Sequence, residues 1–576
     1  VAAGITLTIL DGSGTDLSIS NRVFVYGILA NNGLISSSTE ELVFYNNSVY
    51  KHQRDGGSVP NATWNDGSTC EISGIISAGS LGNTDQSFYH FKWNSTGQTT
   101  ETNLAGDLET IRGNFLMNST GSGSLKLAAS ADFVLTISGN WSHQGGTLNM
   151  GGSSASGVII IHGNFSLSSG KITEAHSASY YSIIRFSKPG TQTFTQRSGT
   201  FENNIDFEVM SSSILDMGES VLSGSLGYFN LNSGATLRTA HAQGIYSSGA
   251  SGCIRTSVRY FSHAAHYHFN RNGSQATGNG LPSSLNGRLT IGSETAATNL
   301  TLTNGSVTIN NQLTLWSTNL LPGTIASGTA YYGASGLLEY RGLSDQNTNV
   351  REWPASSGPF HVTIHNSATV NLTFDRTIQG TLTLQQGSFS IGANTLTLRG
   401  AITQSSGLLL GGSSSILVVE GTSASLILPS VTLLNLFLNR YSGLTTSGNC
   451  SIHGTLNLIS GDFNIGTGKT LYLLGQPVSG LTQNLKGGMS SGLFIGGTAE
   501  GFQVPPGLTV LGTLTIENPQ GAELTSGILI QSQLQVSGKF IMGTFSVSGN
   551  GNYTISQNSR LVVGHPDGVA GNIQLV

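Results

Sequence analysis

The sequence predicts an all-β protein built as an elongated parallel β-solenoid, or β-helix, with about 24–26 residues per coil. Apolar residues alternate with Thr, Ser, Asn or Gln in short runs, as in GTLTLQQGSFSIGANTLTLRG at 380–400, and such alternation is typical of half-buried strands. Gly and Asn separate the runs at positions suited to tight turns. The unit recurs as GTLNLISGDFNIGTGKTLYLLG at 454–475, and repetition of this size indicates a solenoid.

A tandem array of β-sandwiches is the alternative fold, with one sandwich in each long repeat of about 75 residues. An array of this kind predicts a separate core in every block. A solenoid instead predicts a regular spacing of one coil.

Residues 1–108 form the first expected segment, an N-terminal β segment. ITLTI at 5–9 is expected to be a strand, and DGSGTD at 11–16 a turn. The block HQRDGGSVPNATWNDGSTCEISG at 52–74 is less repetitive than the rest of the chain.

Residues 109–285 form the second expected segment, a β-solenoid with a short Gly-Asn-aromatic repeat. The triplet occurs at 113–115, 139–141 and 163–165, at spacings of 26 and 24 residues. Each spacing fits one coil of a solenoid. We therefore expect the aromatic residue of each triplet to stack on its counterpart in the next coil.

Residues 286–576 form the third expected segment, a β-solenoid with a repeat of about 75 residues. A strand-like triplet recurs at 289–291, 362–364, 436–438 and 514–516, in steps of 73, 74 and 78 residues. Three coils of about 25 residues fit each step. Segments that contain Pro precede three of these starts and, because Pro is confined to strand starts and edges, mark where blocks meet: 280–282, 358–360 and 504–507.

Composition excludes several classes of protein. Charged residues make up 9% of the 576, against roughly 25% in ordinary soluble domains, and the net charge is −5. Nucleic acid is not an expected partner, because no basic stripe exists. No membrane span is expected, because no run of about 20 apolar residues occurs. The chain starts with a strand-like stretch, so a signal peptide is expected to have been removed or to lie outside this sequence.

The three cysteines, Cys70, Cys253 and Cys450, lie far apart in the sequence and lack the spacing of a zinc site. We expect three buried thiols that pack as small apolar side chains. A disulfide remains the alternative, because its geometry cannot be judged from sequence.

Several stretches resemble the large repetitive proteins that Bacteroidota secrete or display at the cell surface through the type IX secretion system. The similar stretches are 52–74, QSFYHFKWN at 86–94, SILDMGESVLSGSLGYFNLNSGATLRTAHAQG at 213–244, YHFNRNGSQATGNGLPSSLNG at 267–287, and the GTLTL units. The Pro-x-Ala-Thr-Trp and Ser-Thr-Cys strings within 52–74 are the most specific of these.

This resemblance implies an extracellular or cell-surface location, a β-helical shaft, and an adhesive or structural role. It supplies no catalytic residues. Proteins of this group usually end in a sorting domain, and GHPDGVAGNIQLV at 564–576 does not resemble one. The chain is therefore expected to be either a mature form or a fragment.

Calcium is one candidate ligand. Asp11 and Asp16 stand five residues apart with glycines between them, and calcium loops alternate oxygen ligands around a glycine. The bidentate Glu of a full calcium loop is missing. A plain turn is the alternative, and no other cofactor is expected.

A transition metal is a second candidate ligand. His266 and His268 share one face of a predicted strand, with His263 and Cys253 nearby in the sequence. No carboxylate lies close by in the sequence. Histidines exposed on a polar solenoid face are the alternative.

Glycoside cleavage requires a pair of carboxylates, and acids are sparse in this chain. The densest group is Glu202, Asp206 and Glu208, for which solvated surface acids are the simpler explanation. Some polysaccharide lyases and hydrolases are parallel β-helices, so an enzyme is supported only by analogy of fold. We expect no enzymatic activity.

The five tryptophans could stack on sugars, but four of them stand in strand-like settings where packing in the core is expected. They are Trp64, Trp93, Trp141, Trp316 and Trp353.

The expected function is that of an extracellular structural or adhesive protein, a surface shaft or fibre subunit. Both ends of the sequence are plain strands without an evident cap, and open solenoid ends expose unpaired strand edges. Head-to-tail self-association, or contact with a cell surface or polysaccharide, is therefore expected. The alternatives are a polysaccharide-acting enzyme and a carbohydrate- or calcium-binding module.

Overall fold

The computed structural model of the protein is nearly all β. Short strands pair in parallel from one coil to the next, and about 26 coils follow one another along the chain. The predicted parallel β-solenoid is therefore confirmed. Tandem β-sandwiches are excluded, because the strands of a sandwich pair in antiparallel fashion. The described residues are 1–151, 154, 156–175 and 181–575.

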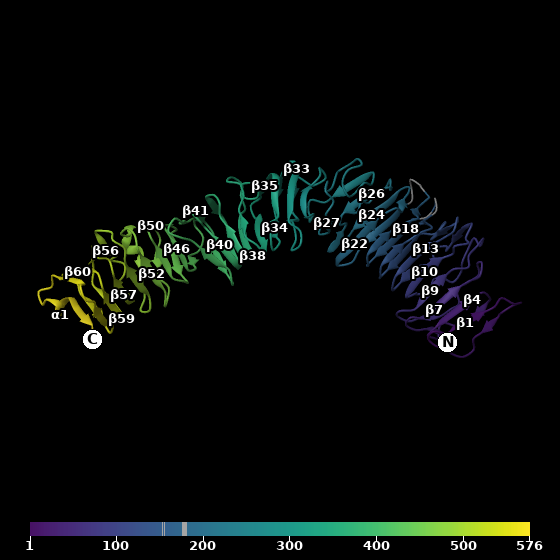
Figure 1. The fold of residues 1–576 in the computed structure, drawn as a ribbon, viewed down its shortest axis with the longest axis horizontal. Coiled ribbons are helices and arrows are strands. Elements are labelled where there is room, and N and C mark those ends of the chain that lie inside the picture. The colour runs from purple at the N-terminus through teal and green to yellow at the C-terminus, as the bar shows by residue number, and fades with distance from the viewer. Residues whose placement is uncertain (152–153, 155, 176–180, 576) are drawn as a thin grey trace. The chain divides into compact units, whose positions relative to one another are not determined.

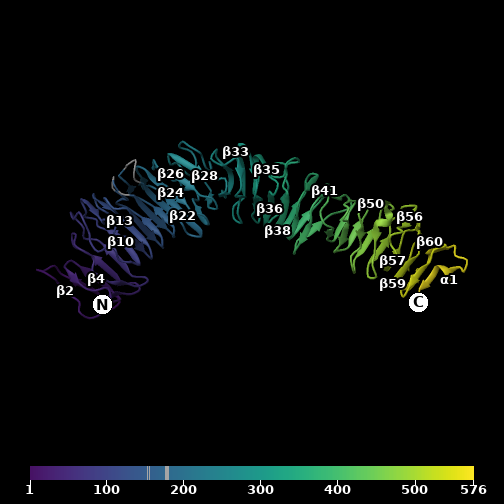
Figure 2. The same ribbon diagram turned by 180° about the vertical axis from the view of Figure 1, so that it is seen from behind.

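Two compact units divide the chain near residue 300. The first contains residues 1–290 and 300–305, and the second contains 291–299 and 306–576. Figure 1 and Figure 2 show the strands of each unit stacked side by side, from the front and from behind. The three segments expected from the sequence remain a prediction, and strands on the two sides of residue 108 pair directly.

Three parallel sheets form the walls of the first unit over most of its length. One contains β9 (Thr69–Ile72), β10 (His90–Asn94), β13 (Phe115–Ser119), β16 (Trp141–His143), β19 (Phe165–Leu167) and β22 (Gly190–Gln196). The second contains β11 (Glu101–Asn103), β14 (Ser124–Lys126), β17 (Thr147–Asn149), β20 (Lys171–Thr173) and β23 (Thr200–Phe201). The third contains β12 (Thr110–Ile111), β15 (Phe133–Ile137), β18 (Gly157–Ile161), β21 (Ser182–Phe186), β24 (Ile205–Val209), β26 (Tyr228–Leu231) and β28 (Val258–Phe261).

Several parallel sheets form the walls of the second unit beyond residue 376, and three of them contain most of its strands. One contains β39 (Arg376–Ile378), β41 (Thr395–Leu398), β44 (Ile416–Glu420), β47 (Asn435–Asn439), β50 (Leu456–Ser460) and β53 (Ser479–Gly480). Another contains β45 (Leu426–Leu428), β48 (Leu444–Thr446), β51 (Phe463–Asn464) and β54 (Leu485–Lys486). The third contains β46 (Val431–Leu433), β49 (Cys450–Ile452), β52 (Thr470–Leu473), β55 (Gly492–Ile495), β57 (Val510–Ile516), β59 (Ile528–Val536), β61 (Val547–Gly549) and β64 (Ile573–Leu575).

Helix is confined to two short segments of the described chain, the 3-10 helix η1 (Thr482–Asn484) and α1 (Val569–Asn572). Neither is long and apolar enough to cross a membrane.

The core of each unit is a set of apolar columns, because every second residue of a strand points inward and lies in register with its neighbours. In the third sheet of the first unit, one column joins Leu135, Ile159, Ile184, Phe207 and Phe229. All five side chains are at most 1% exposed.

Coils that carry the Gly-Asn-aromatic triplet have the length that the sequence predicted. The aromatic residues Phe91, Phe115, Trp141 and Phe165 are register partners in consecutive coils. Hydrogen bonds between the corners of the same coils join positions 24, 26 and 24 residues apart. The short repeat of this segment therefore corresponds to one coil.

Coils of the second unit have the predicted length as far as residue 362, since Leu313, Leu338 and Val362 are register partners 25 and 24 residues apart, and they are shorter beyond it. The register partners here are Leu396, Leu417, Leu436 and Leu456. Side-chain hydrogen bonds between the same coils join positions 21, 19 and 20 residues apart. The strands have three to five residues, as in the first unit, so the shortening lies in the corners.

Beyond residue 362, the long sequence repeat therefore does not contain a whole number of coils. The repeat starts at 436–438 and 514–516 lie in two different sheets, on β47 and β57. The expectation of three coils per step is wrong here, because three of these shorter coils leave part of the step unfilled. The same sequence unit is thus placed on different faces of the solenoid.

Each residue of the Gly-Asn-aromatic triplet has a separate structural role. Glycine sits where the coils approach most closely, and a Cβ at Gly139 would lie only 2.5 Å from the Gly113 carbonyl oxygen. The aromatic rings stack in the core as predicted, with centroids 5.7 Å apart for Phe115 and Trp141 and 5.0 Å apart for Trp141 and Phe165.

Asparagine connects one coil to the next at the corner. The Asn114 side-chain oxygen accepts the backbone N–H of Asn140 at 2.9 Å, and Asn140 accepts the N–H of Asn164 at 2.8 Å. Asn164 in turn accepts the N–H of Thr193 at 2.8 Å. These bonds satisfy backbone donors that the corner removes from the strand ladders. We call this series the asparagine ladder.

Replacing Asn140 with Ala should lower the free energy of unfolding by about 1 kcal/mol, because the N–H of Asn164 loses its acceptor. Asn140→Asp keeps an oxygen at the same position and is the matched control. The measurement is the urea midpoint followed by tryptophan fluorescence. Equal loss in both variants would show that the hydrogen bond does not contribute.

Candidate functional site

The proposed calcium loop is a turn with a structural contact. The Asp16 carboxylate accepts the backbone N–H of Leu34 at 2.7 Å, so it closes the corner of the following coil. Asp16 is half-buried and Asp11 is exposed. Among the described residues, no group of three or more His, Cys, Asp or Glu side chains is placed to hold a metal ion. Calcium binding by Asp11 and Asp16 stays a prediction.

His266 and His268 lie on the same outward face of β29 (His266–Phe269), as the alternation predicted, with Tyr267 buried between them. Nδ1 of His266 accepts the backbone N–H of Arg288 at 2.9 Å. Nδ1 of His268 accepts the Arg238 Nε–H at 3.1 Å. Burial lowers the pKa of His266. One nitrogen of each ring therefore supports the fold, and metal binding stays a prediction.

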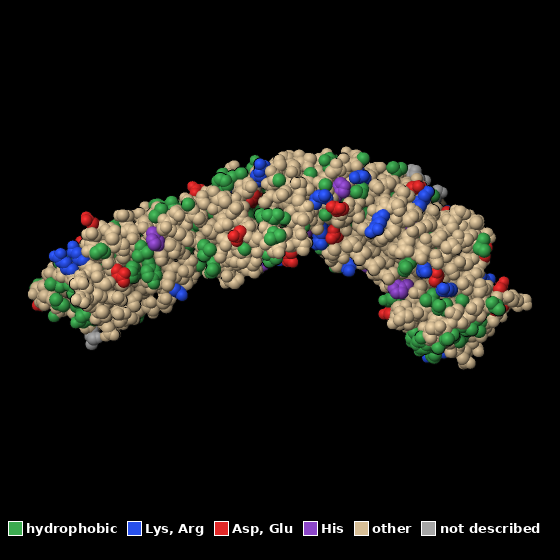
Figure 3. Space-filling view, viewed as in Figure 1, with side chains coloured by type: hydrophobic (Ala, Val, Ile, Leu, Met, Phe, Trp, Pro, Cys, Tyr) green, Lys and Arg blue, Asp and Glu red, His purple; other side chains and the backbone are tan. Residues whose placement is uncertain are grey.

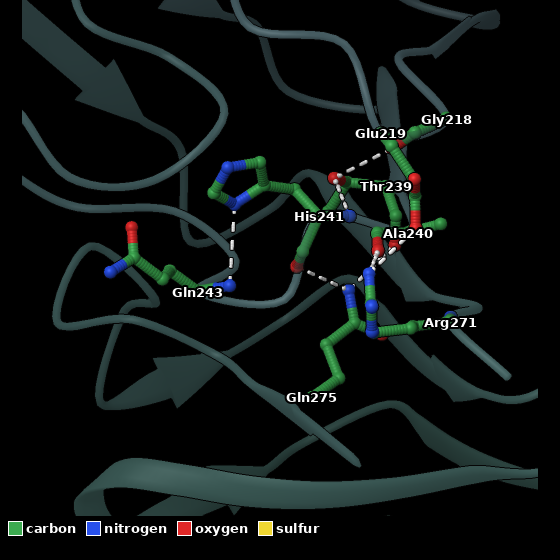
Figure 4. Close-up of polar contacts among 8 residues, drawn as sticks. All are labelled: Gly218, Glu219, Thr239, Ala240, His241, Gln243, Arg271 and Gln275. Carbon is green, nitrogen blue, oxygen red and sulfur yellow. Dashed lines mark hydrogen bonds and ion pairs between the residues drawn. The ribbon is translucent and has the colours of Figure 1, made fainter. Parts of the chain in front are cut away.

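A polar cluster next to this strand consists of contacts between corners (Figure 4). The Gln275 amide donates to the carbonyl oxygens of Thr239 and His241 at 2.8 and 3.0 Å. Arg271 pairs with Glu219 at 2.7 Å and also donates to the Ala240 carbonyl at 3.1 Å. The groups of this polar cluster bond to backbone carbonyls and to one another, so the cluster connects neighbouring coils.

The acidic group predicted at 202–208 is divided by the strand. Glu202 pairs with Lys171 at 3.0 Å, whereas Asp206 and Glu208 point outward from β24. Glu208 is held by Arg185 at 2.8 Å and by the hydroxyl of Tyr228 at 3.4 Å.

Asp206 is only 8% exposed and accepts the backbone N–H of Tyr228 at 2.9 Å. Burial raises its pKa to about 6, and the charges of Glu208 and Glu174 add to the effect. The two outward acids of β24 thus differ in environment, since Glu208 has a cationic partner and Asp206 has none within ion-pair distance among the described residues.

The tryptophans and cysteines lie where the sequence predicted. Four tryptophans are at most 3% exposed, namely Trp64, Trp93, Trp141 and Trp353. Trp316 lies under the guanidinium of Arg341, whose carbon is 4.6 Å from the ring centroid. Cys70, Cys253 and Cys450 are buried free thiols, and burial raises the pKa of each.

A cavity of about 400 Å³ in the second unit is the most developed candidate site. It lies beside β39, the first strand of its sheet, where no earlier strand covers the core within that sheet. Residues of the segment 353–359 form one wall. The other wall contains Asp375, Arg376, Thr377, Gln379, Thr395 and Thr397.

Glu352 is buried immediately before this segment and is 2% exposed. One carboxyl oxygen accepts the Asn349 N–H at 2.5 Å and the Tyr340 hydroxyl at 3.3 Å. Its other oxygen has no hydrogen-bond partner among the described residues. Burial raises the pKa of Glu352 to about 8, so the carboxyl is mainly protonated at neutral pH.

Arg376 lines the cavity and is 7% exposed. It occupies an inward position of β39, in register with the buried Leu396 of β41. Nη1 donates to the Asp375 carbonyl at 2.7 Å, whereas Nε and Nη2 have no partner among the described residues. The guanidinium carbon is 5.1 Å from the ring centroid of Phe374. Burial lowers the pKa of Arg376.

Comparisons with known proteins return no match: no family model, no curated protein and no solved structure is similar to this chain. The resemblance to proteins secreted by Bacteroidota therefore remains an expectation.

Sequence reasoning missed the two buried charged residues Glu352 and Arg376. The available signal was the Pro-containing segment at 358–360, which was recognised as the start of a block but not as the wall of a cavity.

Replacing Glu352 with Gln should flatten the dependence of stability on pH. The folded-state pKa near 8 exceeds the ordinary value of 4.5, so the stability contributed by the protonated carboxyl is complete below pH 4.5 and is lost as pH rises to about 8. The loss is about 1.4 kcal/mol per pH unit within that window. Melting temperatures from pH 5 to 8 should therefore fall more steeply for the unmodified protein than for Glu352→Gln.

The exposed Glu523 provides a matched control, because Glu523→Gln removes a carboxylate without changing a buried group. Parallel pH profiles for the unmodified protein and Glu352→Gln would contradict the assignment.

Proposed function

We propose that this protein is an extracellular structural or adhesive protein, a surface shaft or fibre subunit. One observation carries this proposal: contacts between neighbouring coils continue along each unit. Corner side chains and apolar core columns both hold one coil against the next. Charged side chains are few and scattered on the visible face of each unit, which leaves a surface dominated by uncharged polar groups (Figure 3).

The proposed end-to-end association is supported by the terminal strands. Leu7 of β1 (Thr6–Ile9) is 41% exposed, although its register partner Leu29 of β4 (Ile28–Asn31) is fully buried. Tyr553 of β62 (Asn552–Ile555) is 53% exposed opposite the buried Leu534. Leu7 and Tyr553 are thus exposed at core-facing positions that a further parallel strand would cover.

A polysaccharide-acting enzyme remains the alternative, and the different environments of Asp206 and Glu208 are what favour it. A carboxyl whose pKa is raised by burial, as that of Asp206 is, is suited to a general acid role. Release of reducing ends from a polysaccharide panel, abolished by Asp206→Asn, would favour the enzyme. No release from any member of the panel would count against it.

The replacement Thr8→Pro tests end-to-end association. The carbonyls of Ile5 and Ile9 accept bonds from the β4 side, so in a parallel ladder the N–H of Thr8 points to the opposite, open edge. Proline removes this outward donor and leaves the β1–β4 bonds in place.

Negative-stain electron microscopy and sedimentation of the unmodified protein should show end-to-end oligomers, and Thr8→Pro should shorten them. Monodisperse single particles at high protein concentration would contradict the fibre proposal and leave a single adhesive shaft.

A further inference from the structure

A second cavity lies in the first unit, at one corner of consecutive coils. Its volume is about 490 Å³, within the range of small-molecule sites, about 300–1,000 Å³. The lining comes from four coils, which contribute Thr39, the stretch 61–64, residues between 83 and 87, and Arg112. Hydrogen bonds join the coils at this corner, from the Thr63 hydroxyl to the Thr39 carbonyl at 2.7 Å and from the Asn83 amide to the Asn61 side chain at 3.0 Å.

The walls of this cavity are built where the sequence departs from its repeat. The stretch 61–64 belongs to the Pro-x-Ala-Thr-Trp string, within the least repetitive block of the chain, and Gln86 and Ser87 begin the stretch 86–94. Stacking in a solenoid requires only the residues that pack one repeat on the next. Two irregular stretches that meet at one cavity therefore indicate a role beyond stacking.

Gln86 holds the walls of the cavity in place. Its side-chain oxygen accepts the backbone N–H of Ala62 at 2.9 Å and the indole N–H of Trp64 at 3.0 Å. Its amide nitrogen donates to the carbonyl oxygens of Pro60 and Asn83, each at 3.0 Å. Trp64 is 3% exposed, so its ring anchors the wall in the core. The cavity is therefore preorganised, which lowers the cost of binding a ligand.

Several polar side chains of the lining are accessible and are not used by the fold. Thr39, Asp85 and Ser87 are exposed, and their side chains make no hydrogen bond or ion pair among the described residues. Asn61 is exposed as well, and its amide nitrogen has no partner in the described parts of the chain. Hydroxyl, carboxylate and amide groups are thus free to bond to a ligand.

The accessible charge of the cavity is negative. Arg112 is compensated, because its Nη1 lies 2.6 Å from a carboxylate oxygen of Asp66 and its Nη2 donates to the Trp64 carbonyl. Asp85 has no cationic nitrogen within 4.0 Å among the residues that the structure describes. Its carboxylate disfavours an anionic ligand and is a strong acceptor for hydroxyl groups.

We infer that this cavity binds a neutral sugar, a hexopyranose, with the Asp85 carboxylate accepting hydrogen bonds from the sugar hydroxyl groups. The side chains of Thr39, Asn61 and Ser87 complete the polar contacts. A ring with several hydroxyl groups matches this lining, because each hydroxyl both donates and accepts hydrogen bonds. The inference goes beyond the proposed structural role and does not depend on whether the protein self-associates.

Saturation-transfer difference NMR of the full chain tests the inference with D-glucose, D-galactose, D-mannose and N-acetyl-D-glucosamine. At least one of these sugars should show a transfer signal that saturates in a titration. Asp85→Ala should weaken its binding about tenfold, the effect expected of one hydrogen bond to a charged group. Asp107→Ala is the matched control, because Asp107 is also exposed and does not line the cavity.

Ser87→Ala gives a second reading. It should weaken binding of the same sugar and leave the melting temperature unchanged, because the Ser87 hydroxyl is exposed and makes no hydrogen bond among the described residues. D-glucuronate should bind more weakly than the neutral sugar, because Asp85 repels its carboxylate.

Three outcomes would overturn the inference. One is the absence of a transfer signal for every neutral sugar. Another is neutral-sugar binding that Asp85→Ala leaves unchanged. The third is binding of spermidine, but of none of the sugars, that Asp85→Ala removes, which would assign the cavity to a cation.

Discussion

The structure depends on one constraint, the in-register parallel ladder between consecutive coils. Every corner interrupts the ladder and leaves backbone N–H groups without strand partners. A side chain of the preceding coil supplies the missing acceptor, as Asn114 does for the backbone N–H of Asn140. Asp16, His266, His361 and Asn435 accept a corner N–H in the same way. Asp16 and His266, which the sequence suggested as metal ligands, thus help to hold successive coils in register.

How much could be predicted from the sequence depends on how locally each feature is encoded. Alternation and glycine placement specify strands and turns, so the solenoid and the stacking of Trp141 between Phe115 and Phe165 could be derived. The face on which a repeat lies could not be derived, because the offset between bonded corners of neighbouring coils ranges from 19 to 29 residues and small differences accumulate. Similar triplets at 436–438 and 514–516 therefore end in different sheets.

The cavity beside β39 could not be predicted for a related reason. Arg376 stands in an alternating strand pattern that normally places an apolar residue inward, as Leu396 does in the next coil. β39 begins its sheet, and the segment 353–359 lines the cavity beside it. That arrangement brings residues from separate coils together, and no local spacing in the sequence records it. The buried Glu352 immediately precedes the same segment.

Amide hydrogen exchange of the unmodified protein tests the central role of the corner contacts most directly. If side-chain acceptors complete the ladder, the backbone N–H groups of Asn140, Asn164 and Thr193 should exchange as slowly as those inside the adjoining strands. Exchange at the rate of an unprotected peptide at these three positions, with protected strands on both sides, would contradict the account.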